Sequence, residues 1–144
     1  MNIEKSIKQI LSMNNNYEKE LKIEELSDNI EYSKNIQNED LIKGISLLLE
    51  YGLKLNKGTL KETVFSTIFT SVLNHEIAPK INWDNLSDIL FNLDEECLDY
   101  SLSFLGFSHN KKYIDIISKC LVSSSSDIKE SAEEALNEIN SHTA

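Results

Sequence analysis

The sequence predicts an all-α fold of stacked antiparallel helix pairs, with about seven to eight helices in total. Three observations predict it. The 144 residues contain one proline and four glycines, so residues that interrupt helices are scarce. Apolar residues recur at spacings of three and four, and the carboxy-terminal half contains an internal repeat. The length fits a single domain over 1–144, large enough for a helical core without disulfide or metal.

The amino-terminal part, residues 1–37, is expected to form variable helices. Apolar residues at helical spacing predict a short amphipathic helix over the first dozen residues: Ile3, Ile7, Ile10 and Leu11. Three asparagines then indicate a break. A weaker pattern, with Leu21, Leu26 and Ile30 on its apolar side, predicts either a helix over 17–32 or a partly irregular segment.

Residues 38–144 are expected to form the regular helix pairs. Dense apolar residues predict a helix over 39–51, which pairs with a long helix over 59–74. The second segment is rich in β-branched residues and would also suit a strand, but its apolar spacing favours a helix. Pro79, the single proline, marks one firm joint. Further helices are predicted over 83–92, 94–107, 110–122 and 127–140, each after a polar residue suited to cap it: Asn82, Asp94, Asn110 and Ser126.

The internal repeat has a period of 31 residues. This shift aligns seven apolar or small pairs: Leu86 with Ile117, Ile89 with Cys120, Leu90 with Leu121, Cys97 with Ile128, Ser101 with Ala132, Phe104 with Ala135, and Leu105 with Leu136. One helix pair cannot bury both of its apolar faces, whereas stacked pairs form a continuous core. Small residues at Ser101 and Ala132 are expected to let the helices approach closely.

The composition is strongly acidic. Fourteen Lys and Arg oppose 24 Asp and Glu, for a formal net charge of −10. This balance argues against general binding of nucleic acid or an anionic membrane, and favours either a basic partner or simple solubility. No signal peptide and no apolar run of membrane-spanning length is recognisable, so we expect a cytoplasmic protein.

Two acidic clusters are candidate partner-binding surfaces. The first contains Asp84, Asp88, Asp94, Glu95, Glu96 and Asp99. The second forms one face of the last helix and contains Asp127, Glu130, Glu133, Glu134 and Glu138. Such clusters attract a basic partner and speed its association. The alternatives are ordinary: acidic residues suit the positive end of the helix that follows Asp94, and charge runs commonly form a solvated face.

Aromatic residues offer further candidates. Tyr100 and Tyr113 each adjoin a charged residue and are the better candidates for interface contacts, while Trp83 and Phe104 are expected in the core. No catalytic motif is recognisable, and the three histidines are dispersed, with His109 expected as an exposed loop residue. Cys97 and Cys120 fit small core positions. The sequence therefore predicts neither an enzyme nor a cofactor or metal site.

The segment LDYSLSFLGFSHNKKYIDIISKCLVSSSSDIKESAEEALNEI resembles HEAT-type helical repeats. That resemblance implies a right-handed α-solenoid whose inner helices, here 59–74, 94–107 and 127–140, line one face. In size, acidity and pattern the whole chain resembles the small immunity proteins of bacterial polymorphic toxin and contact-dependent growth inhibition systems.

The second resemblance implies a function. The chain would bind a basic carboxy-terminal toxin domain, expected to be a nuclease, and block its active or substrate-binding surface stoichiometrically. It would be a monomer when free and would contact neither nucleic acid nor membrane. The alternative is an adaptor of HEAT-type repeats that holds its partner without inhibiting it.

Overall fold

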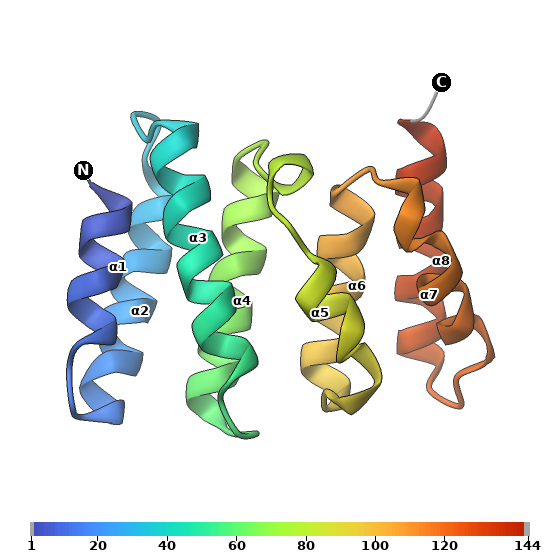
Figure 1. Ribbon diagram of the computed structural model, residues 1–144, viewed down its shortest axis with the longest axis horizontal. Coiled ribbons are helices and arrows are strands. Elements are labelled where there is room, and N and C mark those ends of the chain that lie inside the picture. Colours follow the sequence, from blue (N-terminus) through green and yellow to red (C-terminus); the bar gives the residue numbers. More distant parts are fainter. Residues whose placement is uncertain (1, 143–144) are drawn as a thin grey trace. The chain divides into compact units, whose positions relative to one another are not determined.

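The computed structural model describes residues 2–142, and these form helices and connecting turns without any strand. Eight α-helices and four 3-10 helices follow one another along this part of the chain. They divide into two compact units, residues 1–77 and 78–144 (Figure 1). The boundary adjoins Pro79, the joint that the sequence indicates. The predicted all-α architecture of stacked helix pairs is confirmed, while the right-handed solenoid stays a prediction.

The first unit consists of two helix pairs. Its helices are α1 (Ile3–Leu11), α2 (Asn16–Tyr32), α3 (Asn38–Leu53) and α4 (Thr59–Asn74). Helix α1 of the first pair packs on α3 of the second, and α2 packs on α4. Asp40 joins the pairs, because its carboxylate accepts hydrogen bonds from the backbone N–H groups of Ile3 (2.6 Å) and Glu4 (3.0 Å). These N–H groups belong to the first turn of α1 and have no partner within that helix.

The buried face of α2 differs from the expected one. Helix over 17–32 is confirmed, but Leu21 is 46% exposed, and the buried stripe runs through Lys19, Ile23, Leu26 and Ile30. Ile23 lies one turn after Lys19, whose aliphatic stem is also buried. The ammonium group of Lys19 donates to the Tyr51 hydroxyl at 3.0 Å. A lysine therefore occupies a position that a purely apolar pattern does not identify.

The second unit repeats one design twice. A short, interrupted segment precedes a longer helix in each repeat, in the order η1 (Ala78–Lys80), α5 (Asp84–Asp88), η2 (Leu90–Asn92), α6 (Glu95–Phe107), η3 (Lys111–Tyr113), α7 (Ile114–Ser118), η4 (Lys119–Val122) and α8 (Ser126–Ser141). The 31-residue shift carries the start of α6 onto the start of α8. Within this unit α6 packs along α8.

The interrupted segments correct the prediction of continuous helices over 83–92 and 110–122. Backbone N–H groups here bond three residues back, as from Ile89 to Leu86 and from Asn92 to Ile89. Such short segments have little helical stability of their own, so burial of a few side chains decides their geometry. The cap of the last helix is also one residue earlier than predicted, since Ser125, not Ser126, accepts from the Ile128 N–H.

The core of the second unit contains the predicted aromatic pair. Trp83 and Phe104 are fully buried, with stacked rings whose centroids lie 5.2 Å apart. The Trp83 indole N–H donates to the carbonyl oxygen of Ala78 at 2.9 Å, which satisfies the polar atom of this side chain. Ser101 and Ala132 are buried as expected. A Cβ at Gly106 would lie only 2.8 Å from Cα of Ala135, so close approach of α6 and α8 also depends on Gly106.

Candidate partner-binding groove

The predicted acidic residues around the start of α6 have different roles. The carboxylate of Asp94 accepts from the Cys97 N–H at 2.9 Å and caps α6. Its role is therefore to stabilise the start of this helix, as acidic residues at such a position commonly do. Glu95 and Glu96 are exposed in the first turn of α6. Asp99 lies one turn further on and accepts a hydrogen bond from the Ser131 hydroxyl of α8. Asp99 thus links α6 to α8 through a hydrogen bond.

Asp84 and Tyr113 form an internal contact. Tyr113 is only 4% exposed, and its hydroxyl donates to the Asp84 carboxylate at 2.7 Å. The Lys112 ammonium lies 2.9 Å from the same oxygen, and its hydrogen bond, followed by that of Tyr113, holds the pKa of Asp84 below its usual value. Burial, followed by the bond to Asp84, raises the pKa of Tyr113. Tyr113 was expected at an interface, but it lies inside the second unit, because this hydrogen bond lets the core accept its ring.

The remaining predicted residues lie at or near the surface. Asp88 is exposed at the end of α5, Tyr100 is half-buried on α6, and Glu130 and Glu134 are exposed on α8. Along α8, Glu130 and Glu134 stand four residues apart, and Glu138 follows at the same spacing. Residues at this spacing lie on one face of a helix. The structure thus aligns the second acidic cluster along one side of α8.

A groove between α6 and α8 combines apolar and acidic groups. It contains a pocket of about 160 Å³. Gly106, Phe107 and Ala135 provide apolar surface, and the polar lining comes from two hydroxyls and two carboxylates: Ser103, Ser131, Glu134 and Glu138. We call these seven residues the α6–α8 groove. Such a pocket can take a side chain with an apolar stem and a cationic end.

The charges of the second unit are separated by element. Helices α6 and α8 together contain eight Asp and Glu and a single lysine, Lys129. Three of the unit's five lysines, Lys111, Lys112 and Lys119, lie in the segment from η3 to η4. Because α6 and α8 have so few cations, the carboxylates beside the groove contribute a negative potential.

A larger pocket lies in the first unit, between α1 and α2, with a volume of about 420 Å³. Its charged lining residues, Lys22 and Glu25, pair with each other at 3.5 Å. The pocket therefore offers no net charge to a ligand, and its remaining polar lining is uncharged: Ser6, Gln9 and Asn29. The smaller α6–α8 groove has the more distinctive chemistry.

Two hydroxyl residues of the groove, Ser103 and Ser131, were not identified from the sequence. Glu138, in contrast, belongs to the predicted acidic face of the last helix, four residues after Glu134. The histidines are also not all dispersed. His109 and His142 lie together beside Glu138, and His109 is only 27% exposed. His75 lies in the first unit, where its Nε2–H donates to the carbonyl of Ile30 at 2.9 Å.

Comparison of the chain with models of protein families, with curated proteins and with solved structures finds no match. Among residues 2–142, moreover, no helix combines the length and apolar character that crossing a bilayer requires.

Proposed function

We propose that this chain is an immunity-type protein, which neutralises a cognate bacterial toxin domain by binding it one to one. The partner is a basic protein surface, and the α6–α8 groove is the central contact. Inhibition is by occlusion of the toxin's active or substrate-binding surface, without turnover and without a cofactor. The free protein is a monomer, and it acts in the cytoplasm on a toxin that enters or is made there.

The observation that carries the proposal is the combination of groups in the α6–α8 groove. Phe107 and Ala135 give apolar surface for the methylene stem of a lysine or arginine. Glu134 places an exposed carboxylate where the cationic end of that side chain would lie. Glu138, whose Oε2 is bonded to His109 and His142, lines the same pocket. A charge-assisted hydrogen bond in a partly desolvated pocket is stronger than one between neutral groups. A basic side chain of the partner is therefore the natural occupant.

The wider surface supports the same partner chemistry. Exposed carboxylates of α6 and α8 extend beyond the groove, among them Glu95, Glu130 and Glu133. A surface of one sign speeds association with an oppositely charged partner and disfavours wrong partners. A cleft that binds nucleic-acid phosphates is positively charged, so an acidic inhibitor can occupy it in place of substrate. A nuclease is therefore the class of toxin that fits best.

The test is a calorimetric titration of the purified chain with the carboxy-terminal domain of the protein encoded immediately upstream. Co-expression of the two in a bacterial host provides the second readout. The proposal expects one-to-one binding together with protection of the host. Binding without protection would identify the adaptor instead. Absence of both binding and protection would refute both functions for this partner.

A further inference from the structure

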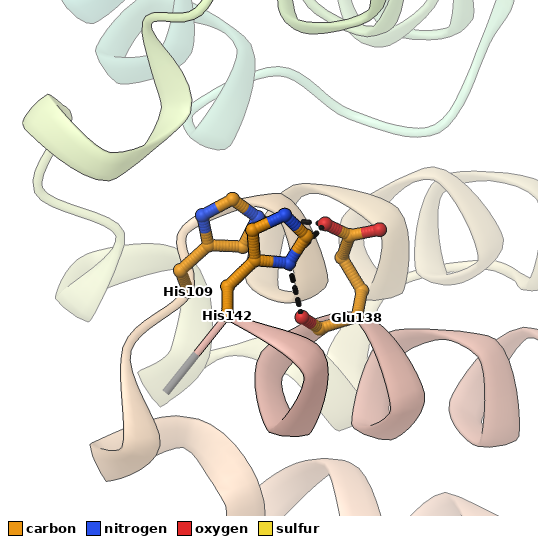
Figure 2. Close-up of side chains that lie close together, drawn as sticks. All are labelled: His109, Glu138 and His142. Carbon is orange, nitrogen blue, oxygen red and sulfur yellow. Dashed lines mark hydrogen bonds and ion pairs between the residues drawn. The ribbon is translucent and has the colours of Figure 1, made fainter. Parts of the chain in front are cut away.

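Three side chains of the second unit converge at the carboxy-terminal end of α8. Nε2 of His109 lies 2.7 Å from Oε2 of Glu138, and Nδ1 of His142 lies 3.0 Å from the same oxygen. The two imidazole rings stack in parallel, with centroids 3.9 Å apart. Figure 2 shows the rings face to face beside the Glu138 carboxylate. Two aromatic nitrogens and one carboxylate oxygen therefore lie within 4.8 Å of one another.

The backbone on each side of this cluster is shaped to present these groups. His109 is the one non-glycine residue of the described chain in the left-handed region, with φ of 54°. The turn around it is held by Ser108, whose hydroxyl donates to the Leu105 carbonyl and accepts from the Asn110 N–H. A strained position supported in this way is a feature often found at functional sites. Glu138 and His142 lie one turn apart on α8, so they share a face.

The donor set selects a class of ligand. Imidazole nitrogen and carboxylate oxygen are ligands of zinc and related transition-metal ions, whereas calcium and magnesium prefer oxygen alone. Zinc has no geometric preference of its own among these ions, so it tolerates an irregular site. With bonds of about 2.0–2.1 Å, tetrahedral zinc separates neighbouring ligand atoms by about 3.3 Å. The observed separations of 2.7 and 3.0 Å are only a few tenths of an ångström shorter.

We propose that His109, Glu138 and His142 form a zinc-binding site, with three protein ligands and one position left for water or a partner's side chain. The three candidate ligand atoms lie within 4.8 Å of one another, and rotation of the two imidazole side chains brings their nitrogens to the shorter spacing that a single zinc ion requires. Bound zinc joins the last turn of α8 to the turn that follows α6. It thereby fixes one end of the helix pair that flanks the α6–α8 groove.

Zinc competes with hydrogen bonds of the metal-free state. Each ring donates a proton toward Glu138, and Nδ1 of His142 also lies 2.9 Å from the Glu138 carbonyl oxygen. To bind the ion through these nitrogens, each ring carries its proton on the other nitrogen instead, and His142 gives up its bond to the carbonyl. The rings also turn out of their parallel stack, because each nitrogen binds a metal in the plane of its own ring and parallel planes do not meet at one ion. Imidazolium cannot ligate, so binding weakens as the pH falls.

The direct test is titration of the untagged full-length chain with Zn²⁺ alone, by calorimetry and by competition with a chromophoric chelator. We expect one ion per chain with a dissociation constant on the order of micromolar or below. His109→Asn is a suitable variant because asparagine tolerates the left-handed backbone. We expect His109→Asn, Glu138→Gln and His142→Asn each to weaken binding more than about tenfold.

Two matched variants control for unspecific effects. Glu134→Gln removes a carboxylate one turn away on α8, and His75→Gln removes the histidine of the first unit; both are expected to bind Zn²⁺ as the unchanged chain does. The proposal would be overturned if the unchanged chain bound no stoichiometric Zn²⁺, or if His109→Asn and Glu138→Gln bound Zn²⁺ as tightly as the unchanged chain.

A second measurement needs no variant. The ring nitrogens of all three histidines can be followed by NMR as Zn²⁺ is added to the unchanged chain. The signals of His109 and His142 are expected to shift with one equivalent, and those of His75 to stay. A shift confined to His75, or no shift at all, would refute the site.

Discussion

The two units have similar numbers of acidic residues but use their lysines differently. Residues 1–77 contain 12 Asp and Glu with nine lysines, and residues 78–144 contain 12 with five, so the formal charges are −3 and −7. In the first unit three ion pairs form within helices at four-residue spacing, as in Glu39 with Lys43. In the second unit the Lys112–Asp84 pair instead joins separate elements. The acidic character of α6 and α8 is therefore not neutralised along those helices.

The first unit also takes lysines into its interior. Lys19 donates to Tyr51, over whose ring its ammonium lies at 5.1 Å, and Lys61 donates to the Leu55 carbonyl at 3.0 Å. The hydrogen bonds of these buried ammonium groups replace bonds that water would otherwise make. The two units therefore use charged residues differently. Lysines take part in the packing of the first unit, whereas carboxylates face outward in the second.

Replacement of Trp83 by alanine is expected to have the largest effect, because it removes a fully buried ring from the core of the second unit. We expect a loss of about 3–5 kcal/mol in the free energy of unfolding. Urea unfolding followed by far-UV circular dichroism measures it. Phe91→Ala is the control, since Phe91 is 55% exposed and its loss should cost about 0.5 kcal/mol or less. Equal effects of the two substitutions would contradict the burial described here.

Glycine substitutions compare helix packing in the two units. At Gly106 a Cβ would meet the backbone of Ala135 at 2.8 Å, which cannot move away without separating α6 from α8. At Gly44 the nearest atoms, at 2.7 and 2.9 Å, are side-chain methyl groups of two buried residues, Cγ2 of Ile3 and Cδ1 of Ile7. We expect Gly106→Ala to cost about 1–3 kcal/mol. Gly44→Ala should cost less than Gly106→Ala, because side-chain methyl groups can shift where a backbone cannot, and the gain of about 1 kcal/mol in helix propensity offsets part of the repacking.

Thermal and urea unfolding of both glycine variants checks this prediction. A Gly44→Ala variant as unstable as Gly106→Ala would show that the first unit is packed as rigidly as the second.

Charge reversal tests whether the partner uses the second unit. Glu134→Lys places a cation at the α6–α8 groove, and we expect it to weaken partner binding about 10- to 100-fold and to reduce its salt dependence. Glu24→Lys is the matched control on α2, since Glu20 and Asp28 flank it at four residues as Glu130 and Glu138 flank Glu134. Calorimetry at two salt concentrations measures both. Equal loss in the two variants would mean that overall charge, and not the groove, governs binding.

The smallest effect concerns pH. Hydrogen bonds from Lys112 and then Tyr113 lower the pKa of Asp84 below 3.8, so its carboxylate stabilises the folded state above that pH. That contribution is lost as the pH falls through the lowered pKa. We therefore expect Asp84→Asn to reduce the melting temperature at pH ~7, with a difference that closes below pH ~3.8.

Fluorescence of Trp83, the single tryptophan, reports this melting in the second unit. Asp88→Asn, an exposed change on the same short helix, serves as the control. A difference that stays constant between neutral and acid pH would argue against the Asp84 contacts.

The sequence by itself determined the helical class, the position of most long helices and the repeat of the second unit. These features depend on local propensity and on apolar spacing, which a single chain displays directly. The 31-residue register correctly placed Leu86 and Ile117, Cys97 and Ile128, and Ser101 and Ala132 at buried positions. The positions of the acidic residues likewise predicted the charge of α6 and α8.

Only the tertiary structure decided which polar residues meet. Tyr113 lies in the core because Asp84, 29 residues away, accepts its hydroxyl proton in a hydrogen bond. His109 and His142 come together because the turn after α6 lies beside the last turn of α8, and Glu138 joins them. Lys19 is buried because Tyr51 is within reach. Apart from the contact between Glu138 and His142, which are four residues apart, each of these contacts joins residues far apart in the chain. A pattern of neighbours along the sequence carries no information about such distances.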